Sequence, residues 1–553
     1  MAIIFPLVSI QAVISFMVFV SFFILLKRRV VVNPRLSTKA CLPPGPKPWP
    51  IIGNLYLLIN NKPFSQWIHD AMSKMSVEIF CIRLGNVHVI AVTSPEISCE
   101  FLKKHDLSFA SRPNFLSAEL VSKFSTAALT PMGDQWKKMR RVLVSNILSP
   151  TSHKWMHEKR VKEVDHLVRY VWNLIKGNNG VVNVRVVTQH FCTNVIRQMI
   201  FSKRFFGEGT LNEGPGVEEE EHVDGLFKIL KYLYSFSISD YVPFLRRRLD
   251  LDGHEKAIMR ALKSINKYQD PEIDSRIKQW KDGTRQKKDD FLDVLITLQD
   301  NNENALLTRK EIKAQIMEIM IATIDNPSNA VEWIIGEMIN NTEILVKAIQ
   351  ELDQVVGKDR LVQESDIPKL NYIKACIRES FRIHPMAPFN VPHVSMCDTM
   401  VSGYFIPEGS HVLLSRIGLG RNPRIWDEPL LFKPERHLKD DKSQVILTDP
   451  DLRLLSFSIG RRGCPGVNLG STMSIMLLAR LLQAFTWCPL PNTSCVNLME
   501  SKDDMSISKP LHAFAIGKND AVFASRPIIL SAEVVAKVVS GGFSAVTWTP
   551  LND

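Results

Sequence analysis

The sequence is poor in cysteine, and its cysteines are not arranged in a way that would support a disulfide framework. Nine of the 553 residues are cysteine, an odd number spread singly along the chain, and no Cys-x-x-Cys pair occurs. Small disulfide-stabilised domains carry an even number of cysteines at regular spacings. The pattern therefore indicates a reducing compartment, in which a single cysteine can have a role of its own.

Long runs of basic residues are also missing. Lys and Arg number 68 against 57 Asp and Glu, a net charge of +11, and the basic residues are scattered in twos and threes. A nucleic-acid-binding protein gathers such an excess in arms or stripes, so we expect no nucleic-acid partner. A membrane surface or an acidic protein fits the scattered excess better. The content of 45% hydrophobic and 23% charged residues is that of a globular protein and excludes a disordered or coiled-coil chain.

The start of the chain lacks charge altogether. Residues 2–26 contain no acidic or basic side chain, and Lys27, Arg28 and Arg29 follow at once. A helix of this length reaches about 37 Å, which exceeds the ~30 Å hydrocarbon core of a bilayer. Because basic residues stay on the cytosolic side and no small-residue cleavage site follows, residues 1–29 are predicted to be a retained transmembrane signal anchor. A buried helix is the alternative.

Proline is concentrated directly after this segment. Residues 43–50 hold five prolines in eight positions, which neither a helix nor a central strand accommodates. Such a stretch favours an extended, stiff conformation. We expect residues 30–54 to be a basic and proline-rich hinge that fixes the tilt of the following domain on the membrane, with a plain linker as the alternative.

Residues 55–515 are predicted to form one large domain that is mainly α with a minor β-sheet region. Alternating β-branched residues at 87–92 indicate a strand. The acidic, glycine-rich stretch 207–221 is expected to be a solvated surface loop. An apolar period of 3.6 residues predicts long helices at 154–176, 311–340, 343–356 and 371–383.

Residues 516–553 form an atypical tail. Within it, residues 518–537 repeat residues 104–123 with 13 of 20 positions identical. A single copy of a segment that is buried elsewhere in a fold has no partner surface of its own. We therefore interpret the tail as a fused piece of a related coding sequence or an incorrectly joined gene model, with a regulatory tail as the alternative.

One cysteine stands in a motif that suits a haem-iron thiolate. Phe457, Gly460, Arg462, Cys464 and Gly466 fill every fixed place of the pattern Phe-x-x-Gly-x-Arg-x-Cys-x-Gly. The glycines allow a tight turn that brings amide N–H groups toward the sulfur and tunes the iron. The arginine supplies a cation for a haem propionate, and the phenylalanine can pack on the porphyrin. A deprotonated Cys464 would be the metal ligand.

Three further motifs follow the order and spacing expected with that loop. Glu379 and Arg382 lie three apart on one helical face, and Arg436 follows about fifty residues later in Phe-Lys-Pro-Glu-Arg-His. Trp136 and Arg140 lie one helical turn apart. The set, over residues 42–512, resembles the cytochrome P-450 haem-thiolate monooxygenases, and the anchor and hinge resemble those of microsomal members.

The resemblance implies a cytochrome P-450 fold preceded by one N-terminal transmembrane helix, in the endoplasmic reticulum membrane with the catalytic domain in the cytosol. It implies haem as cofactor, O2 and NADPH as co-substrates, and an NADPH-cytochrome reductase as electron donor, because the chain has no nucleotide-binding Gly-x-Gly-x-x-Gly after a strand. Cys464 would be the axial ligand. Glu379, Arg382 and Arg436 would form a structural ion-pair triad. The haem propionates would be held by Trp136, Arg140, His393 and Arg462.

One stretch departs from the general pattern of that family. Where the central helix of these enzymes carries an acid and a proton-delivering threonine, this chain has Asp325, Asn326 and Pro327. Proline has no N–H to donate to the carbonyl of Thr323, and its ring crowds that oxygen. We therefore expect the helix to open here, and list Thr323, Asp325, Asn326 and Pro327 as catalytic candidates. A harmless helix kink is the alternative.

The Asn-Pro-Ser sequence at 326–328, with His437 in place of the commoner phenylalanine, resembles the plant amino-acid N-monooxygenases that form aldoximes. The implied reaction is two successive N-hydroxylations of an L-amino acid, followed by dehydration and decarboxylation. Such oximes lead to glucosinolates, cyanogenic glycosides or nitrogenous defence volatiles. Our hypothesis is that the Thr323 carbonyl and Asp325 accept from the substrate amine.

The identity of the amino acid is not readable from the sequence. Phe389, Met320 and Phe115 are candidates for a pocket that selects a hydrophobic or aromatic side chain such as that of phenylalanine. Two other functions remain open. One is a membrane monooxygenase that hydroxylates carbon in another plant metabolite, and the other is an inactive haem protein.

Overall fold

The structure of the chain is a computed structural model that describes residues 41–518, apart from 62, 212, 244–245, 247, 440–442 and 502–504. The predicted anchor at 1–29, the first part of the hinge at 30–40 and residues 519–553 of the tail lie outside the described residues. Among the helices that are described, none combines the length and the apolar character needed to cross a membrane.

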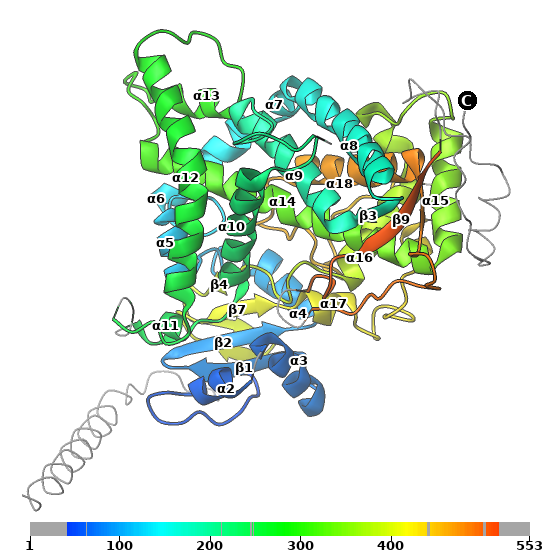
Figure 1. The fold of residues 1–553 in the computed structure, drawn as a ribbon. Coiled ribbons are helices and arrows are strands. Elements are labelled where there is room, and N and C mark those ends of the chain that lie inside the picture. The colour runs from blue at the N-terminus through cyan, green and yellow to red at the C-terminus, as the bar shows by residue number, and fades with distance from the viewer. Residues whose placement is uncertain are drawn as a thin grey trace, which may run out of the picture.

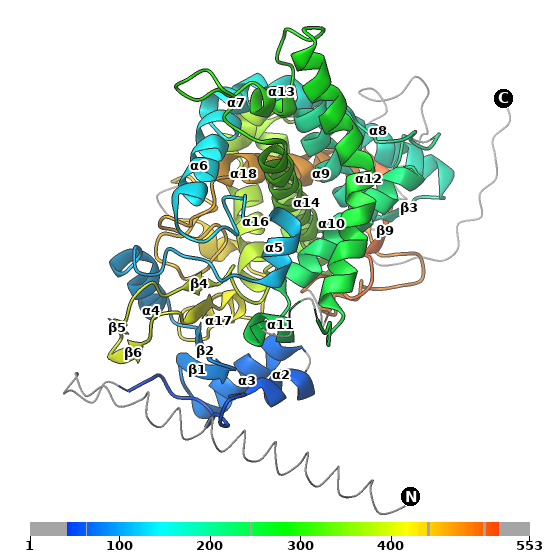
Figure 2. The ribbon, with the colours of Figure 1, turned by 90° about the vertical axis from the view of Figure 1, so that its left-hand side faces the viewer.

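A long central helix organises the domain. Helix α14 (Arg309–Asn340) begins with a capping box, in which Thr308 and Glu311 bond reciprocally to each other's backbone N–H. It is buried on nearly all sides, as expected for a helix through the middle of a core. It packs against α9 (Val184–Phe201), α18 (Val467–Ala484) and α16 (Asn371–Ile383), and runs through the middle of the helical part in Figure 2.

The other long helices surround this core. Helix α10 (Val217–Tyr234) packs on α12 (His254–Lys281), and α8 (His157–Gly177) packs on α9. Shorter elements complete the helical part: α2 Leu55–Asn60, α3 Phe64–Met75, α4 Pro95–Cys99, η1 Glu100–Lys104, α5 Leu116–Ser122, α6 Asp134–Val142, η2 Leu143–Ile147, α7 Pro150–Trp155, α11 Ile238–Tyr241, α13 Phe291–Ile296, α15 Thr342–Val355, η4 Glu364–Lys369, α17 Arg416–Gly420 and η5 Pro434–His437.

The strands form small sheets at the margin of the helices. The four-stranded sheet has the order β1-β2-β7-β4, with β1 antiparallel and β7 parallel to β2. Figure 1 shows it with α2 and α3 at one end of the molecule. A three-stranded sheet has the order β3-β9-β8, and β5 pairs with β6. The strands are β1 Ile79–Leu84, β2 Val87–Val92, β3 Val181–Asn183, β4 His393–Val394, β5 Thr399–Val401, β6 Tyr404–Ile406, β7 His411–Leu414, β8 Phe485–Cys488 and β9 His512–Gly517.

The mainly α fold with small sheets that the sequence predicts is confirmed. Strand 87–92 and helix 371–383 have the expected bounds, and the helix expected at 154–176 is divided into α7 and α8. The expected loop at 207–221 is wrong in its last part, because α10 begins at Val217. Glu219 is buried there and forms an ion pair of 2.5 Å with Arg197. Glutamates in a first turn are also stabilised by the helix dipole.

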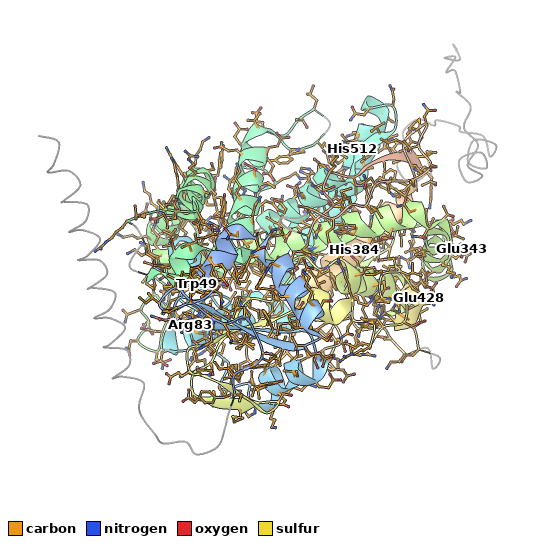
Figure 3. The ribbon with its side chains drawn as sticks, turned by 90° about the horizontal axis from the view of Figure 1, so that it is seen from below. Trp49, Arg83, Glu343, His384, Glu428 and His512 are labelled. Carbon is orange, nitrogen blue, oxygen red and sulfur yellow. The ribbon has the colours of Figure 1, made fainter. Side chains whose placement is uncertain are left out.

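Part of the predicted hinge and the first residues of the predicted tail pack against the sheets. The proline-rich segment from residue 41 onward packs against β1, since Cys81 donates its backbone N–H to Pro44 and the Arg83 side chain donates to the Trp49 carbonyl at 2.8 Å. Figure 3 shows Trp49 and Arg83 beside each other. At the other end, β9 continues to Gly517, so residues 516 and 517, assigned to the tail, belong to the sheet.

Candidate functional site

A large cavity lies between α14 and the loop that carries Cys464. Its volume is about 310 Å³, within the range of about 300–1,000 Å³ that is typical of a pocket for a small ligand. Its walls come from α5, the end of α10, the middle of α14, the segment 384–393 and the loop 455–466. The cavity is thus a ligand-sized space walled by elements that lie far apart in the sequence.

Cys464 lies on the cavity wall in a tightly turned loop. Its backbone N–H donates to the Phe457 carbonyl at 2.8 Å, and the Gly466 N–H donates to its Sγ at 3.3 Å. Gly460 has φ +74°, and a Cβ there would meet Asp106 at 2.5 Å. Burial raises the pKa of the Cys464 thiol, while the Gly466 amide and the charge of Arg140 oppose that rise. The loop therefore presents one thiolate-capable sulfur to the cavity with an amide already directed at it.

Three arginines gather at one edge of the cavity. Arg112, Arg140 and Arg462 all line it. Arg462 donates to the carbonyls of Ala110, Ala127 and Thr130, at 2.6, 3.2 and 2.8 Å. Arg112 donates to the carbonyls of Ala128, Val391 and Pro392, and Arg140 donates to that of Gly463.

Among the described residues these arginines hydrogen-bond only to carbonyls, and the single carboxylate that acts on Arg140 and Arg462, that of Glu318, does not balance three positive charges. Burial and the charge of Arg140 together lower the pKa of Arg462 to about 9, against the opposing charge of Glu318. Burial and the charge of Arg462 lower the pKa of Arg112 as well. Enclosed like charges of this kind need an anion. The carboxylates of a haem meet that need, and the soft Cys464 sulfur suits its iron, so the residues present fit the group.

Two of the residues that were expected to hold the haem propionates contact backbone carbonyls in the structure. The Trp136 indole N–H donates to the Ala127 carbonyl at 3.0 Å, and the ring lies 4.4 Å from the Arg462 guanidinium carbon. Trp136 does not line the cavity itself but packs against Arg462, which does. His393 lines the cavity through β4, with Nδ1 2.8 Å from the Phe109 carbonyl. Burial lowers its pKa well below the usual range.

The α14 residues that replace the expected acid–threonine motif lie beside this space. Thr323, Asn326 and Pro327 line the cavity, and Asp325 is half-buried on the same turn. The expectation of an opened helix is wrong, because α14 continues through Pro327 without interruption. Side chains bond to nearby carbonyls instead: Asn326 Nδ2 donates to Ala322 at 3.2 Å and Ser328 Oγ to Ile324 at 2.7 Å. Because proline has no backbone N–H, the Thr323 carbonyl still lacks the hydrogen-bond donor that the residue four positions later normally supplies.

Behind the cavity, the expected triad is assembled with a fourth member. Glu379 is fully buried and bonds to Arg382 at 2.7 Å and to Arg436 at 3.0 Å. His437 Nε2 lies 2.8 Å from the other carboxylate oxygen. Burial alone raises the Glu379 pKa, but the hydrogen bonds from Arg382 and His437 outweigh it and lower the pKa to about 2. In the sequence, His437 was noted only because it replaces the more common phenylalanine, and its contact with Glu379 was not predicted.

Only one of the three expected substrate-pocket residues lines the cavity. Phe115, at the start of α5, does so. Phe389 is wrong, because it points away and stacks on His69 with centroids 4.9 Å apart, while the adjacent Asn390 lines the cavity instead. Met320 is also wrong. It is fully buried on the face of α14 that meets α12, where Gln269 donates to its sulfur.

Sequence reasoning missed three charged residues of this site. Arg112, Arg416 and Glu318 all line the cavity. Glu318 accepts from the backbone N–H groups of Ala127 and Ala128 at 2.8 and 2.6 Å and so joins α14 to the arginine edge. Of these three residues, only Arg112 has a sequence feature that could have drawn attention to it: its Ala-Ser-Arg-Pro sequence occurs again at residues 524–527.

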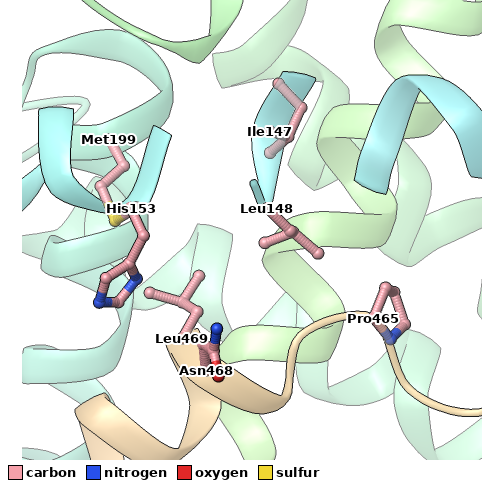
Figure 4. A pocket seen from close by; sticks show the side chains of 7 residues that line it. All are labelled: Ile147, Leu148, His153, Met199, Pro465, Asn468 and Leu469. Carbon is pink, nitrogen blue, oxygen red and sulfur yellow. The ribbon is translucent and has the colours of Figure 1, made fainter. Parts of the chain in front are cut away.

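A second, much smaller hollow lies beside the Cys464 loop and is lined by Pro465 and six other residues. Figure 4 shows Pro465 at its edge, on the loop that leads to Asn468 and Leu469. Pro465 lines both spaces. The segment that follows Cys464 is therefore shared by the large cavity and the small hollow.

Comparison with known proteins agrees with this geometry. Residues 43–514 match the family model described as cytochrome P450. Isoleucine N-monooxygenase 1 of Lotus japonicus is 56% identical over 480 residues, which cover 86% of this chain and 89% of the relative. Tyrosine N-monooxygenase of Sorghum bicolor is 52% identical over 526 residues, 92% and 94% of the two chains. Phenylalanine N-monooxygenase of Arabidopsis thaliana is 51% identical over 496 residues, 88% and 93%.

Proposed function

The chain belongs to the cytochrome P450 family, and from that premise we propose that it is a haem-thiolate monooxygenase that converts a free L-amino acid to its aldoxime. Two N-hydroxylations, each using one O2 and one NADPH through a reductase, precede the loss of carbon dioxide and water. The observation that carries the proposal is that Asn326 and Pro327, which depart from the family's usual acid–threonine motif, line the cavity that Cys464 faces. Relatives named for N-oxygenation of amino acids support it.

The residues that would hold the cofactor follow from the cavity edge. Cys464 would ligate the iron, with the Gly466 amide bonded to the sulfur. Arg112, Arg140 and Arg462 would neutralise the propionates, with Trp136 packed on Arg462. When bound, haem supplies the oxygen-activating chemistry of the family. The protein's own contribution is to orient the amine and to control proton access.

The middle of α14 would position the amine. Pro327 leaves the Thr323 carbonyl without its usual N–H donor, so that oxygen can accept from a substrate amine. The Thr323 hydroxyl itself donates to the Ile319 carbonyl. The Asn326 amide, which replaces the usual hydroxyl at the cavity wall, donates to Ala322. This arrangement favours binding of an N–H donor over delivery of a proton from a side-chain hydroxyl.

The side chain of the substrate is proposed to be hydrophobic or aromatic, as in phenylalanine or isoleucine. Phe115 and other apolar side chains surround the cavity on the side of α5 and α10: Val121, Leu230 and Leu233. An apolar wall selects by shape and discriminates weakly between aliphatic chains that differ by one methylene. We therefore expect one preferred amino acid and slower turnover of close homologues.

We further propose that the protein is anchored in the endoplasmic reticulum membrane with its domain in the cytosol. The uncharged residues 2–26 followed by three basic residues support this. So do the exposed apolar side chains of Trp49, Ile51 and Ile52, which are 56%, 46% and 40% exposed near the start of the described residues. Apolar side chains grouped on a surface mark a contact with protein or lipid.

Expression in microsomes with a reductase and each of the twenty amino acids tests the function, with oxime detected by mass. We expect oxime from one or a few hydrophobic amino acids. No oxime from any of them, despite a normal spectrum of the reduced, carbon-monoxide-bound protein, would exclude the proposal and favour carbon hydroxylation. Absence of that spectrum, or its retention in Cys464→Ser, would exclude haem-thiolate ligation. Chains with and without residues 519–553 should be compared, since the tail is proposed to be dispensable.

The role of the α14 departure is tested by the double change of Asn326→Thr and Pro327→Ser. Restoring the hydroxyl and the backbone N–H should weaken amino-acid binding and lower the fraction of NADPH that yields oxime, by about tenfold if one hydrogen bond to the amine is lost. Oxime yield per NADPH and substrate affinity are the measurements. Unchanged values would eliminate this role. The change Ser328→Ala, on the buried side of the same turn, is the matched control.

A further inference from the structure

Arg416 is an enclosed arginine of the cavity to which the proposed reaction gives no role so far. It follows β7 directly and is the first residue of α17. The preceding Ser415 directs its hydroxyl away, to His69 at 2.6 Å, and alternation along the extended backbone turns the next side chain to the opposite side. Arg416 accordingly lines the cavity.

The Arg416 guanidinium has no hydrogen-bond acceptor and no ion-pair partner among the described residues. Its Nε is buried and unsatisfied. A buried unpaired charge is costly, and native proteins rarely retain one without a reason. The other arginines of the cavity differ, since Arg112, Arg140 and Arg462 each donate to backbone carbonyls. Arg416 is therefore the arginine of this cavity whose donors remain available to a ligand.

Its surroundings place this cation near the reacting space. Burial lowers the Arg416 pKa, whereas Tyr234, Cys464 and Asp325 act in the opposite direction. Tyr234 also acts on Arg112, and Cys464 on Arg140, so Arg416 shares the cavity with the three edge arginines. A haem has two propionates, and the three edge arginines suffice for them. The ligand of Arg416 should then be a different anion that enters the same cavity.

We propose that Arg416 binds the α-carboxylate of the amino-acid substrate. The inference rests on the proposed function and deepens it. A guanidinium presents paired N–H donors that match a carboxylate, and charge-assisted pairs of this kind are strong and geometrically specific. With the carboxylate held on the wall formed by β7 and α17, the amine of the same molecule is left for α14. Arg416 thereby selects free amino acids over amines and esters.

The test compares ligands that differ only in the carboxylate, using purified holoenzyme and equilibrium dialysis. L-Phenylalanine is compared with its methyl ester, and L-isoleucine with its own ester. The unaltered protein should bind its preferred free acid roughly 10- to 150-fold more tightly than the ester. Arg416→Gln should reduce acid affinity to that of the ester, and Arg416→Lys should keep part of the preference. Arg424→Gln, at an exposed surface pair, is the control and should change neither.

Three outcomes would overturn the inference. The first is equal binding of acid and ester by the unaltered protein, which needs no variant and therefore stands even if Arg416→Gln fails to fold. The second is an unchanged acid-to-ester ratio in Arg416→Gln or Arg416→Lys. The third is loss of haem absorbance in both variants with an unchanged apoprotein fold, which would assign Arg416 to the cofactor. If oxime still forms in these cases, the proposed function survives. If no amino acid yields oxime, the function itself fails.

Discussion

Arg382 and Arg416 lie close in the fold and are both enclosed, but their guanidinium groups have opposite surroundings. Arg382 donates to both carboxylate oxygens of Glu379 and to the carbonyls of Gly420, Pro429 and Leu431, at 2.5 to 3.1 Å. Arg416 has no acceptor among the described residues. Gly420 is the last residue of α17 and Arg416 the first. One short helix thus connects two sites: a structural cluster in which the guanidinium is fully hydrogen-bonded, and a cation in the cavity that has no acceptor among the described residues.

The difference distinguishes the two uses of a buried charge. A guanidinium with every donor bonded within the protein contributes to the fold, because removing it leaves its partners buried and unpaired. A guanidinium without partners contributes nothing comparable to the fold and is available to an external anion. Sequence motifs mark the first kind, since Glu379 and Arg382 have a fixed spacing. They do not mark the second, whose partner is not part of the chain.

Replacing each arginine by methionine tests this comparison most strongly. Arg382→Met should lower the free energy of unfolding by about 3–5 kcal/mol, because Glu379 loses its closest cation while it stays buried. Arg416→Met should cost nothing and can stabilise by about 1–3 kcal/mol, the usual penalty of a buried unsatisfied group. Urea unfolding of both variants, measured alongside haem content, gives the answer. Equal losses in the two variants would contradict the distinction.

A smaller effect is expected from His437→Phe, which restores the residue more usual at this place. It removes the 2.8 Å contact to Glu379 but leaves both arginines, so we expect a loss of about 1–2 kcal/mol at pH 7. The matched control is His437→Gln, which retains a donor and should lose less.

The same variant has a consequence for acid stability. In the folded protein, burial raises the Glu379 pKa, but bonds from Arg382 and His437 lower it to about 2, below the ordinary value of 4.5. A lowered carboxyl pKa stabilises the fold above pH 4.5, and that contribution is lost as the pH falls from 4.5 toward 2. Removing His437 raises the folded pKa, so acid unfolding of His437→Phe should begin at a higher pH. Circular dichroism against pH measures the midpoint, and an unchanged midpoint would assign the low pKa to the arginines alone.

Much of the fold could be predicted because local patterns agreed with their surroundings. The β-branched run at 87–92 and the periodic helix 371–383 have their expected bounds. Pro327 shows where a local rule was overridden, since α14 is held by its neighbours on nearly all sides and continues through the proline. Glu219 shows a residue that was expected to be exposed and is buried. Its acidic context suggested solvent, but its partner Arg197 lies on another helix, which no local pattern reveals.

The site was predictable where its residues form a linear motif and not where they meet through the fold. The Cys464 loop and the Glu379–Arg382 spacing are such motifs. Arg416 reaches the cavity because β7 pairs with β2 and places α17 behind it, which the spacing of neighbouring residues does not encode. Phe389 and Met320 were chosen by their position along the chain, yet each lies on the side of its segment that faces away from the cavity.

The weakest effect should come from an exposed pair whose nitrogen–oxygen distance equals that of the buried one. Arg424 and Glu78 are 2.7 Å apart, as are Arg382 and Glu379, but Arg424 is 70% exposed and Arg382 fully buried. Water and salt screen the exposed pair, so Arg424→Gln should cost about 0–1 kcal/mol at low ionic strength and nothing measurable in 1 M salt, where the Debye length is ~3 Å. Urea unfolding at both salt concentrations measures this. A loss as large as that of Arg382→Met would show that distance, and not enclosure, determines the contribution of such pairs to this fold.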